Sequence, residues 1–150
     1  LDPTAAPVTV RNFLSYVASS YYTSTLFHRV VPGFVIQGGG YTTGMERKAG
    51  QSAPIALETP NGLSNVRATV AMARTNVPDS ATSEFFVNLV DNSATLDYRS
   101  AANPGYAVFG TVVQGMDVVD SIATQPTGVV NGFQDVPLSD VTITFALQVK

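Results

Sequence analysis

The pattern of hydrophobic and polar positions predicts two helices. Residues 7–19 repeat apolar side chains at the spacing i, i+3, i+4 and i+7, which is typical of a helix with one buried face. The proline at position 7 suits only the first turn of such a helix. Residues 115–123 show a shorter pattern of the same kind, with apolar side chains along one side. Both segments are therefore predicted to be helical.

Most of the remaining chain predicts short strands. They cover residues 25–31, 34–37, 69–73, 85–90, 106–113 and 141–149. The last of these has the clearest alternation of apolar and polar side chains. Residues 38–60 are predicted to form an irregular loop, and loops of that length are usually functional or mobile. Because strands and helices do not alternate regularly, the pattern favours an α+β fold or a β-barrel with helical caps over a doubly wound sheet.

Composition narrows the class of protein. The 150 residues suit one domain over residues 1–150. Apolar residues make up 45% and charged residues 13%, which predicts a compact folded body. A net charge of −3 makes nonspecific binding to nucleic acid or a membrane surface a poor hypothesis. No apolar stretch approaches the ~18 residues of a membrane span.

The residue types needed for most enzyme chemistry are scarce. The chain has no cysteine, which excludes disulfides, thiol nucleophiles and thiolate metal sites. Its one histidine, His28, lies next to Arg29, so the two side chains point to opposite faces of a strand. A Ser-His-Asp triad is not excluded by spacing, but no nucleophile elbow is present. No clusters of metal-ligating residues occur, so neither a metal nor a cofactor is expected.

Three positions break the expected patterns. Arg29 lies in a run that otherwise predicts a buried strand, so it needs a partner or an opening onto a cleft. Phe86 lies between two polar residues on one strand face, which fits a pocket wall and a half-exposed strand residue about equally. The glycines at 38–40 lack the Lys-Ser/Thr ending of a phosphate loop, and a strand end at which backbones pass closely is favoured.

Four segments together resemble a known family. "FHRVVPGFVIQGGG", "GLSNVRATVAMART", "SATSEFFVNL" and "GYAVFGTVVQGMDVVDSI" are similar, in the same order, to the signature segments of the cyclophilin-type peptidyl-prolyl isomerases, closest to the bacterial branch. The resemblance implies a mainly β fold, an eight-stranded antiparallel barrel capped by two helices. It also implies isomerisation of the peptide bond before proline, in a surface groove, on unfolded or flexible polypeptides that the protein helps to fold.

The resemblance also implies roles for individual residues. Arg29 would be the catalytic residue, and Gln37 would hydrogen-bond to its guanidinium. The backbone of Arg74, beside Ala73, would hold the substrate carbonyl, and Tyr106 would close the groove. The proline pocket would be formed by Phe34, Val35, Phe86 and Leu96, with Met72 beneath, although on its own pattern Met72 more often indicates core than pocket lining.

Two positions depart from the family pattern. Glu84 stands where the family usually has glutamine, and its carboxylate could either orient Arg29 or occupy it; the orienting role is favoured. Thr95 replaces a tryptophan that precedes the residue matching Leu96 in many eukaryotic relatives, where it helps bind cyclosporin. Weak cyclosporin binding is therefore expected.

The expected partners are proline-containing peptides and unfolded proteins. The family's first barrel strand would end near "LDPTAAP", so that strand is apparently missing, through truncation, omission or supply from elsewhere. A monomer is expected unless the missing strand drives pairing. A periplasmic or exported protein is expected, with a cytoplasmic one as the alternative. The alternative function is a proline-peptide-binding or chaperone module with little turnover.

Overall fold

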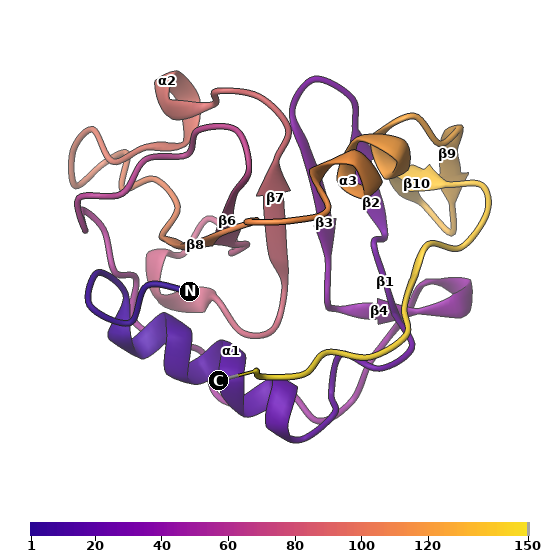
Figure 1. Ribbon diagram of the computed structural model, residues 1–150, viewed down its shortest axis with the longest axis horizontal. Coiled ribbons are helices and arrows are strands. Elements are labelled where there is room, and N and C mark those ends of the chain that lie inside the picture. The colour runs from indigo at the N-terminus through magenta and orange to yellow at the C-terminus, as the bar shows by residue number, and fades with distance from the viewer. Residues whose placement is uncertain (150) are drawn as a thin grey trace.

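The computed structural model describes residues 1–149, and its centre is a five-stranded antiparallel sheet (Figure 1). The strand order is β2-β3-β7-β6-β8, so several hydrogen-bonded neighbours come from distant parts of the chain. Gly33, with φ of 71°, provides the left-handed position in the turn between the first two strands. The strands of this sheet are β2 (Arg29–Val31), β3 (Val35–Gly38), β6 (Thr69–Met72), β7 (Phe85–Asn88) and β8 (Val108–Thr111).

Three antiparallel strand pairs surround this sheet. The hairpin of β9 and β10 packs beside β2, at the end of the central sheet opposite β8 (Figure 1). Single 3-10 turns occupy Thr43–Met45 and Pro78–Ser80. The pairs are β1 (Thr25–Leu26) with β11 (Thr142–Ile143), β4 (Tyr41–Thr42) with β5 (Glu46–Arg47), and β9 (Thr127–Val130) with β10 (Phe133–Pro137).

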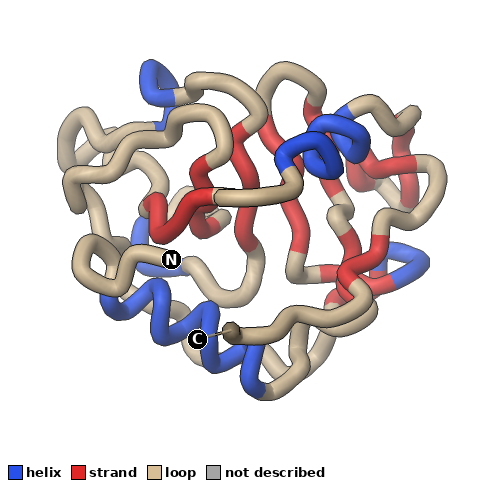
Figure 2. Tube along the Cα trace, in the orientation of Figure 1, coloured by secondary structure: helices blue, strands red, loops and turns tan. Residues whose placement is uncertain are grey.

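Helices lie around the strands, as Figure 2 shows. Both predicted helices are present, as α1 (Pro7–Ala18) and α3 (Met116–Ala123), and the single-turn helix α2 (Ser93–Leu96) was not predicted. The first turn of α1 is capped from a distant loop, because the carboxylate of Glu58 accepts hydrogen bonds from the backbone nitrogens of Val8 at 3.0 Å and Thr9 at 2.8 Å. A carboxylate there also complements the positive end of the helix dipole. None of the helices within residues 1–149 has the length and apolar character needed to cross a bilayer.

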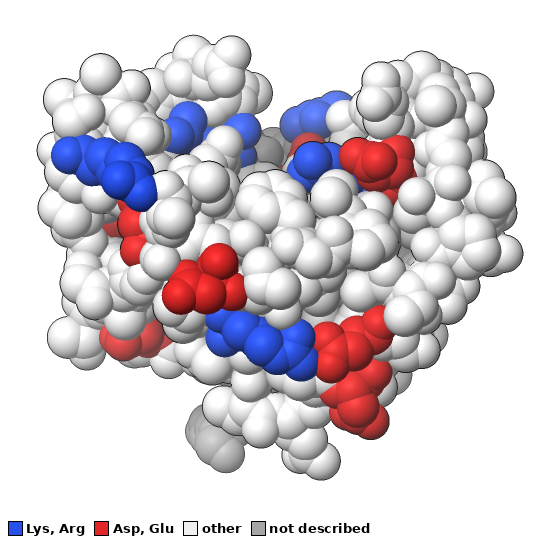
Figure 3. All heavy atoms as spheres, turned by 90° about the horizontal axis from the view of Figure 1, so that it is seen from above, with Lys and Arg blue, Asp and Glu red and all other residues white. Residues whose placement is uncertain are grey.

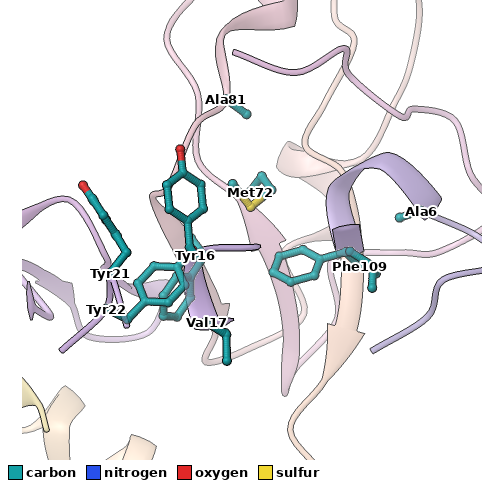
Figure 4. Packing of buried hydrophobic residues seen from close by; sticks show 10 residues of the cluster. Ala6, Tyr16, Val17, Tyr21, Tyr22, Met72, Ala81 and Phe109 are labelled. Atoms are coloured by element: carbon teal, nitrogen blue, oxygen red, sulfur yellow. The ribbon is translucent and has the colours of Figure 1, made fainter. Parts of the chain in front are cut away.

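Aromatic side chains dominate the core between α1 and the sheet (Figure 4). Phe13 of α1 meets Tyr22, Phe85 and Phe109, with ring centroids 5.1, 5.5 and 5.1 Å apart. A separate apolar cluster on the other face of β7 contains Phe86. Strand β7 is therefore buried on both faces, and the alternation of its side chains assigns neighbouring phenylalanines to different clusters.

The predicted final strand is mostly wrong. Of residues 141–149, only Thr142 and Ile143 are in a strand, paired with β1. Phe145, Leu147 and Val149 are 67%, 74% and 86% exposed, although they continue the alternation. Alternation predicts which face of a strand can be buried but does not supply a hydrogen-bonding neighbour. In the part of the chain that the structure describes, no strand pairs with residues 144–149.

The β9–β10 hairpin was missed by the sequence interpretation. Its turn is the pair Asn131-Gly132, with φ of 49° and 84°, the left-handed conformation at both central residues that tight hairpins require. An Asn-Gly pair between two short apolar runs is a strong hairpin signal, so the sequence contained the information. The predicted loop over residues 38–60 likewise contains the short pair β4–β5.

Candidate active site

A groove of about 290 Å³ collects the predicted site residues except Met72 and Glu84. Viewed from above, a notch divides the molecular surface into two lobes, and basic side chains lie on both sides of it (Figure 3). Met72 is 2% exposed and packs in the aromatic core instead. Glu84 lines an adjoining depression that shares Gln37, Ala73 and Arg74 with the groove. The groove is lined by Arg29, Phe34, Val35, Gln37, Ala73, Arg74, Phe86, Leu96 and Tyr106.

Arg29 extends from β2 over one end of the groove. Its Nη1 donates to Oε1 of Gln37 at 3.5 Å, and its Nε lies 3.8 Å from Oδ2 of Asp135. Arg29 and Gln37 are directly opposite each other in the β2–β3 register, which places both side chains on the same face of the sheet. The presence of a charge in an apolar strand is thus explained, because the guanidinium has polar partners and the Arg29 side chain is 39% exposed.

Gln37 connects Arg29 to Glu84. While its oxygen accepts from Arg29, its Nε2 donates to Oε2 of Glu84 at 2.9 Å. An amide can accept on one side and donate on the other, so the carboxylate fixes which way the amide faces. The contact of Glu84 with Arg29 is therefore indirect. Within residues 1–149, no ion pair joins Glu84 to Arg29.

Glu84 is a largely buried carboxylate with several partners. Nε2 of His28 lies 3.4 Å from its Oε2, and Nη1 of Arg47 lies 3.5 Å from its Oε1. Burial by itself would raise the pKa of Glu84, but the hydrogen bonds from His28 and Gln37 and the charges of His28 and Arg47 together hold the pKa below its usual value. Glu84 is therefore ionised at neutral pH, which strengthens the hydrogen bond that it accepts from the Gln37 amide.

The three glycines at positions 38–40, where β3 ends, make room for this arrangement. A Cβ added at Gly40 would lie 2.6 Å from Cγ of Glu84, and one added at Gly38 would lie 2.7 Å from the carbonyl oxygen of Leu26. Neither distance is tolerable between non-bonded atoms. The interpretation of a strand end with close backbone approach fits these contacts, and the glycines allow Glu84 to reach Gln37.

Aromatic and aliphatic side chains form the other end of the groove. Val35 and Phe86 are 2% and 4% exposed, while Leu96, from α2, is 9% exposed. The rings of Phe86 and Tyr106 meet edge to face, 5.7 Å apart at an angle of 79°. Phe34 packs against the same cluster. This end therefore offers an apolar hollow with preformed walls, which suits a proline ring.

Arg74 supports the wall formed by Tyr106. Its guanidinium carbon lies 4.5 Å from the centre of the Tyr106 ring, a cation-π geometry. Its Nε and Nη2 both donate to the carbonyl oxygen of Gly105, at 3.0 and 2.8 Å. The side chain of Arg74 thus fixes the loop before β8 in place.

A buried network of asparagines holds the apolar end from below, and the sequence interpretation missed it. Asn92 donates to the carbonyl oxygen of Phe34 at 2.9 Å. Asn65 donates to the carbonyl oxygens of Leu96 and Tyr106, each at 3.2 Å. Asn88 is 0% exposed and joins the other two asparagines through its own amide. No motif marks these residues, although asparagine within an apolar strand is unusual enough to suggest a buried polar network.

The arrangement as a whole places the guanidinium of Arg29 beside an apolar hollow. Within residues 1–149, no three His, Asp or Glu side chains are grouped so that they could hold a metal ion. The groove can bind an apolar ring and present a hydrogen-bond donor to it. These are the requirements of a reaction in which bonds rotate without being broken.

Comparison with known proteins agrees with this geometry. The family described as "Cyclophilin type peptidyl-prolyl cis-trans isomerase/CLD" matches residues 1–147. A peptidyl-prolyl cis-trans isomerase of Acinetobacter baylyi is 52% identical over 145 residues, covering 97% of this chain and 75% of that protein. Peptidyl-prolyl cis-trans isomerase B of Escherichia coli is 52% identical over 139 residues, covering 92% and 84%.

Solved structures show the same fold at much lower sequence identity. A crystal structure of a cyclophilin-type peptidyl-prolyl cis-trans isomerase from Cryptosporidium parvum, determined in the presence of the dipeptide Ala-Pro, superposes with a TM-score of 0.77 at 22% identity. The match covers 99% of this chain and 89% of that one. The predicted fold class is thereby confirmed. The chain belongs to the cyclophilin-type peptidyl-prolyl cis-trans isomerase family.

Proposed function

We propose that the groove is the place where this cyclophilin-type isomerase rotates X-Pro peptide bonds, with Arg29 as the catalytic residue. Members of the family are peptidyl-prolyl cis-trans isomerases, and their general role is assistance in protein folding. The observation that carries the assignment is the position of the Arg29 guanidinium, held by Gln37 at the rim of the apolar hollow. A proline ring seated in the groove against Phe86 and Tyr106 would lie beside that cation.

The chemistry of the reaction explains why the site needs a hydrogen-bond donor but no other reactive group. Rotation about the X-Pro bond breaks amide resonance and faces a barrier of ~20 kcal/mol. No bond to another atom forms or breaks, so no nucleophile is required. In the twisted transition state the prolyl nitrogen becomes pyramidal and gains a lone pair that the planar amide lacks. A donor aimed at that nitrogen binds the transition state better than the ground state, which is the condition for catalysis.

Arg29 cannot supply the whole acceleration. A millionfold effect would require ~8 kcal/mol, whereas one well-placed donor typically supplies ~3–4 kcal/mol. The rest is assigned to the apolar hollow, which disfavours the charge-separated planar amide, and to a clamp on the substrate carbonyl by the backbone at Ala73 and Arg74. The clamp lets one side of the bond rotate while the other side stays fixed.

The test is cis/trans exchange of an Ala-Pro peptide measured by NMR. Arg29→Ala is expected to slow the catalysed exchange ~100-fold or more while peptide affinity is largely kept. Arg11→Ala, which removes one exposed arginine of α1, is the matched control and should leave exchange unchanged. Peptide binding without exchange in the unaltered protein would instead identify a binding or chaperone module.

The substrates are expected to be proline-containing segments of unfolded proteins. The Cryptosporidium relative was crystallised in the presence of Ala-Pro, which supports a proline-directed groove here. Weak cyclosporin binding is proposed because exposed Thr95 replaces tryptophan beside the groove residue Leu96. A nanomolar dissociation constant by calorimetry would contradict this. A monomer in a periplasmic or exported location stays a prediction.

A further inference from the structure

The β9–β10 hairpin brings a carboxylate to the catalytic cation. Oδ2 of Asp135 lies 3.8 Å from Nε of Arg29, while Gln37 accepts from Nη1 of the same guanidinium. The two partners therefore contact different nitrogens of one planar group. A planar fork held at two of its nitrogens has little freedom to rotate. Within residues 1–149, Nη2 of Arg29 makes no hydrogen bond, so this nitrogen is available to a substrate.

A β-bulge turns Asp135 toward the groove. In the β9–β10 register, Phe133 pairs with Val130 and Val136 pairs with Gly128, so two residues of β10 face one residue of β9. Asp135 is one of the two and has φ of 59°, in the left-handed region that few residues other than glycine adopt. Bulges re-aim side chains and are common beside active sites. Without the bulge, the side chain of Asp135 would point in a different direction from the strand.

Two contacts just before the bulge anchor the hairpin. The ring of Phe133 packs on Tyr41 with centroids 5.1 Å apart, and Tyr41 packs on His28 at 4.7 Å. Nδ2 of Asn131 donates to the carbonyl oxygen of Gly44 at 2.9 Å. The hairpin is thus fixed to the segment that carries Arg29. Asp135 is therefore held in place relative to the guanidinium.

Asp135 is also the carboxylate that directly compensates the charge of Arg29. Glu84, the other acid of this region, contacts His28, Arg47 and Gln37 instead. The side chains of Arg29 and Asp135 are 39% and 45% exposed, so their ion pair adds little to the stability of the fold. The catalytic rate is far more sensitive than the stability to this ion pair, because displacing a catalytic donor by about 1 Å can lower the rate ~100-fold.

We propose that Asp135 is a positioning residue for catalysis, which holds the Arg29 guanidinium with Nη2 directed at the prolyl nitrogen. The proposal rests on the catalytic role assigned to Arg29. Asp135 makes no contact with the reacting atoms and acts through the arginine. Its removal should therefore lower turnover and leave peptide affinity almost unchanged.

The experiment compares Asp135→Asn with the unaltered protein by NMR exchange of an Ala-Pro peptide. Asp135→Asn should lower kcat/KM by about 3- to 10-fold, less than the loss of the donor itself, with peptide Kd within about twofold. Asp120→Asn is the matched control, because it breaks an ion pair of similar exposure, to Arg67, outside the groove. That control should leave kcat/KM unchanged. Asp135→Glu should recover part of the lost rate.

Two further measurements separate positioning from a structural role. Salt at about 1 M shortens the Debye length to ~3 Å, which is less than the 3.8 Å between Arg29 and Asp135, so it should slow the unaltered protein and leave Asp135→Asn unaffected. In an Arg29→Ala background, Asp135→Asn should change nothing further. An Asp135→Asn variant as fast as the unaltered protein, or faster, would overturn the proposal. If Arg29→Ala catalysed cis/trans exchange as fast as the unaltered protein, the catalytic role assigned to Arg29 would be overturned instead.

Discussion

The two ends of the groove are built in different ways. The apolar end consists of Phe34, Val35, Phe86, Leu96 and Tyr106. The polar end consists of Arg29 and Gln37, together with the acids Asp135 and Glu84 that contact them from outside the groove. At the apolar end, buried side chains pack on a fixed network of asparagines. At the polar end, one partly exposed guanidinium lies 3.5 Å from Gln37 and 3.8 Å from Asp135.

This difference separates what each end controls. Burial of apolar area contributes to folding and to the binding of a ring, so changes at the apolar end should affect stability and affinity together. Orientation of a charged donor affects the transition state while exposed ion pairs contribute little to folding. Changes at the polar end should therefore affect turnover more than stability. The predictions below test that separation.

The largest expected effect is that of Phe86→Ala. Phe86 is 4% exposed and lies between Gln37 and Ala71 in the strand register. Truncating a buried phenylalanine costs about 3–5 kcal/mol in the free energy of unfolding, through lost burial and the cavity left behind. Urea unfolding should show this loss, and NMR titration should show weaker Ala-Pro binding. Phe86→Leu should lose much less stability and much less affinity for the peptide. If Phe86→Ala kept its affinity, this end would not be the proline site.

Asn88→Ala should have the next largest effect. Nδ2 of Asn88 donates to Asn65 at 3.1 Å and to Thr69 at 3.0 Å, and its oxygen accepts from Asn92 at 2.8 Å. Removing the Asn88 amide leaves its buried polar partners without hydrogen bonds, which lowers the free energy of unfolding by about 1–3 kcal/mol. Urea unfolding measures the loss, and Asn103→Ala, in an exposed turn, is the matched control. Equal stability of the two variants would mean that the network does not support the groove.

One end of the groove is more fully predictable from the amino-acid sequence than the other. Strand parity placed Phe86 on a face opposite Phe85, and the structure assigns the two rings to different clusters. The family resemblance named Arg29 and Gln37, which are in contact. Both successes depend on local spacing within one strand or on a matched motif.

The failures concern contacts between distant segments. Asp135 reaches Arg29 only because a bulge and a missed hairpin carry it there, and no local pattern predicts that contact. Met72 was assigned to the groove by resemblance, yet it packs in the aromatic core. Phe145 continues an alternation that lacks a partner strand within residues 1–149. Tertiary context decides each of these, and it is not encoded in periodicity alone.

Acid should destabilise the polar end through Glu84. Hydrogen bonds and nearby charges outweigh burial and lower the pKa of Glu84 in the folded state. The unfolded chain therefore binds protons more readily, so the stabilisation is complete above the ordinary carboxyl pKa of about 4 and is lost as the pH falls through the lower folded pKa. Urea unfolding between about pH 6 and pH 3 should show a steeper decline for the unaltered protein than for Glu84→Gln. Parallel curves would contradict the assignment.

The same variant should change turnover only modestly. Glutamine at position 84 keeps an acceptor for Nε2 of Gln37 but loses the charge that strengthens this bond, now 2.9 Å long. We expect kcat/KM to fall by about 2- to 5-fold, because Glu84 acts on Arg29 only through Gln37. A large rise in turnover would show that the carboxylate occupies Arg29 and inhibits it.

The smallest effect is expected for Tyr106→Phe. The ring of Tyr106 meets Phe86 edge to face and carries the guanidinium of Arg74 at 4.5 Å. Both contacts use the ring, and within residues 1–149 the hydroxyl makes no hydrogen bond. Phenylalanine keeps both contacts, so exchange rate and peptide Kd should stay within about twofold of the unaltered values. Tyr106→Ala, which removes the ring, should weaken binding clearly. A loss with phenylalanine as large as with alanine would mean that the hydroxyl contacts the substrate, and that the apolar end also works through a directional polar contact.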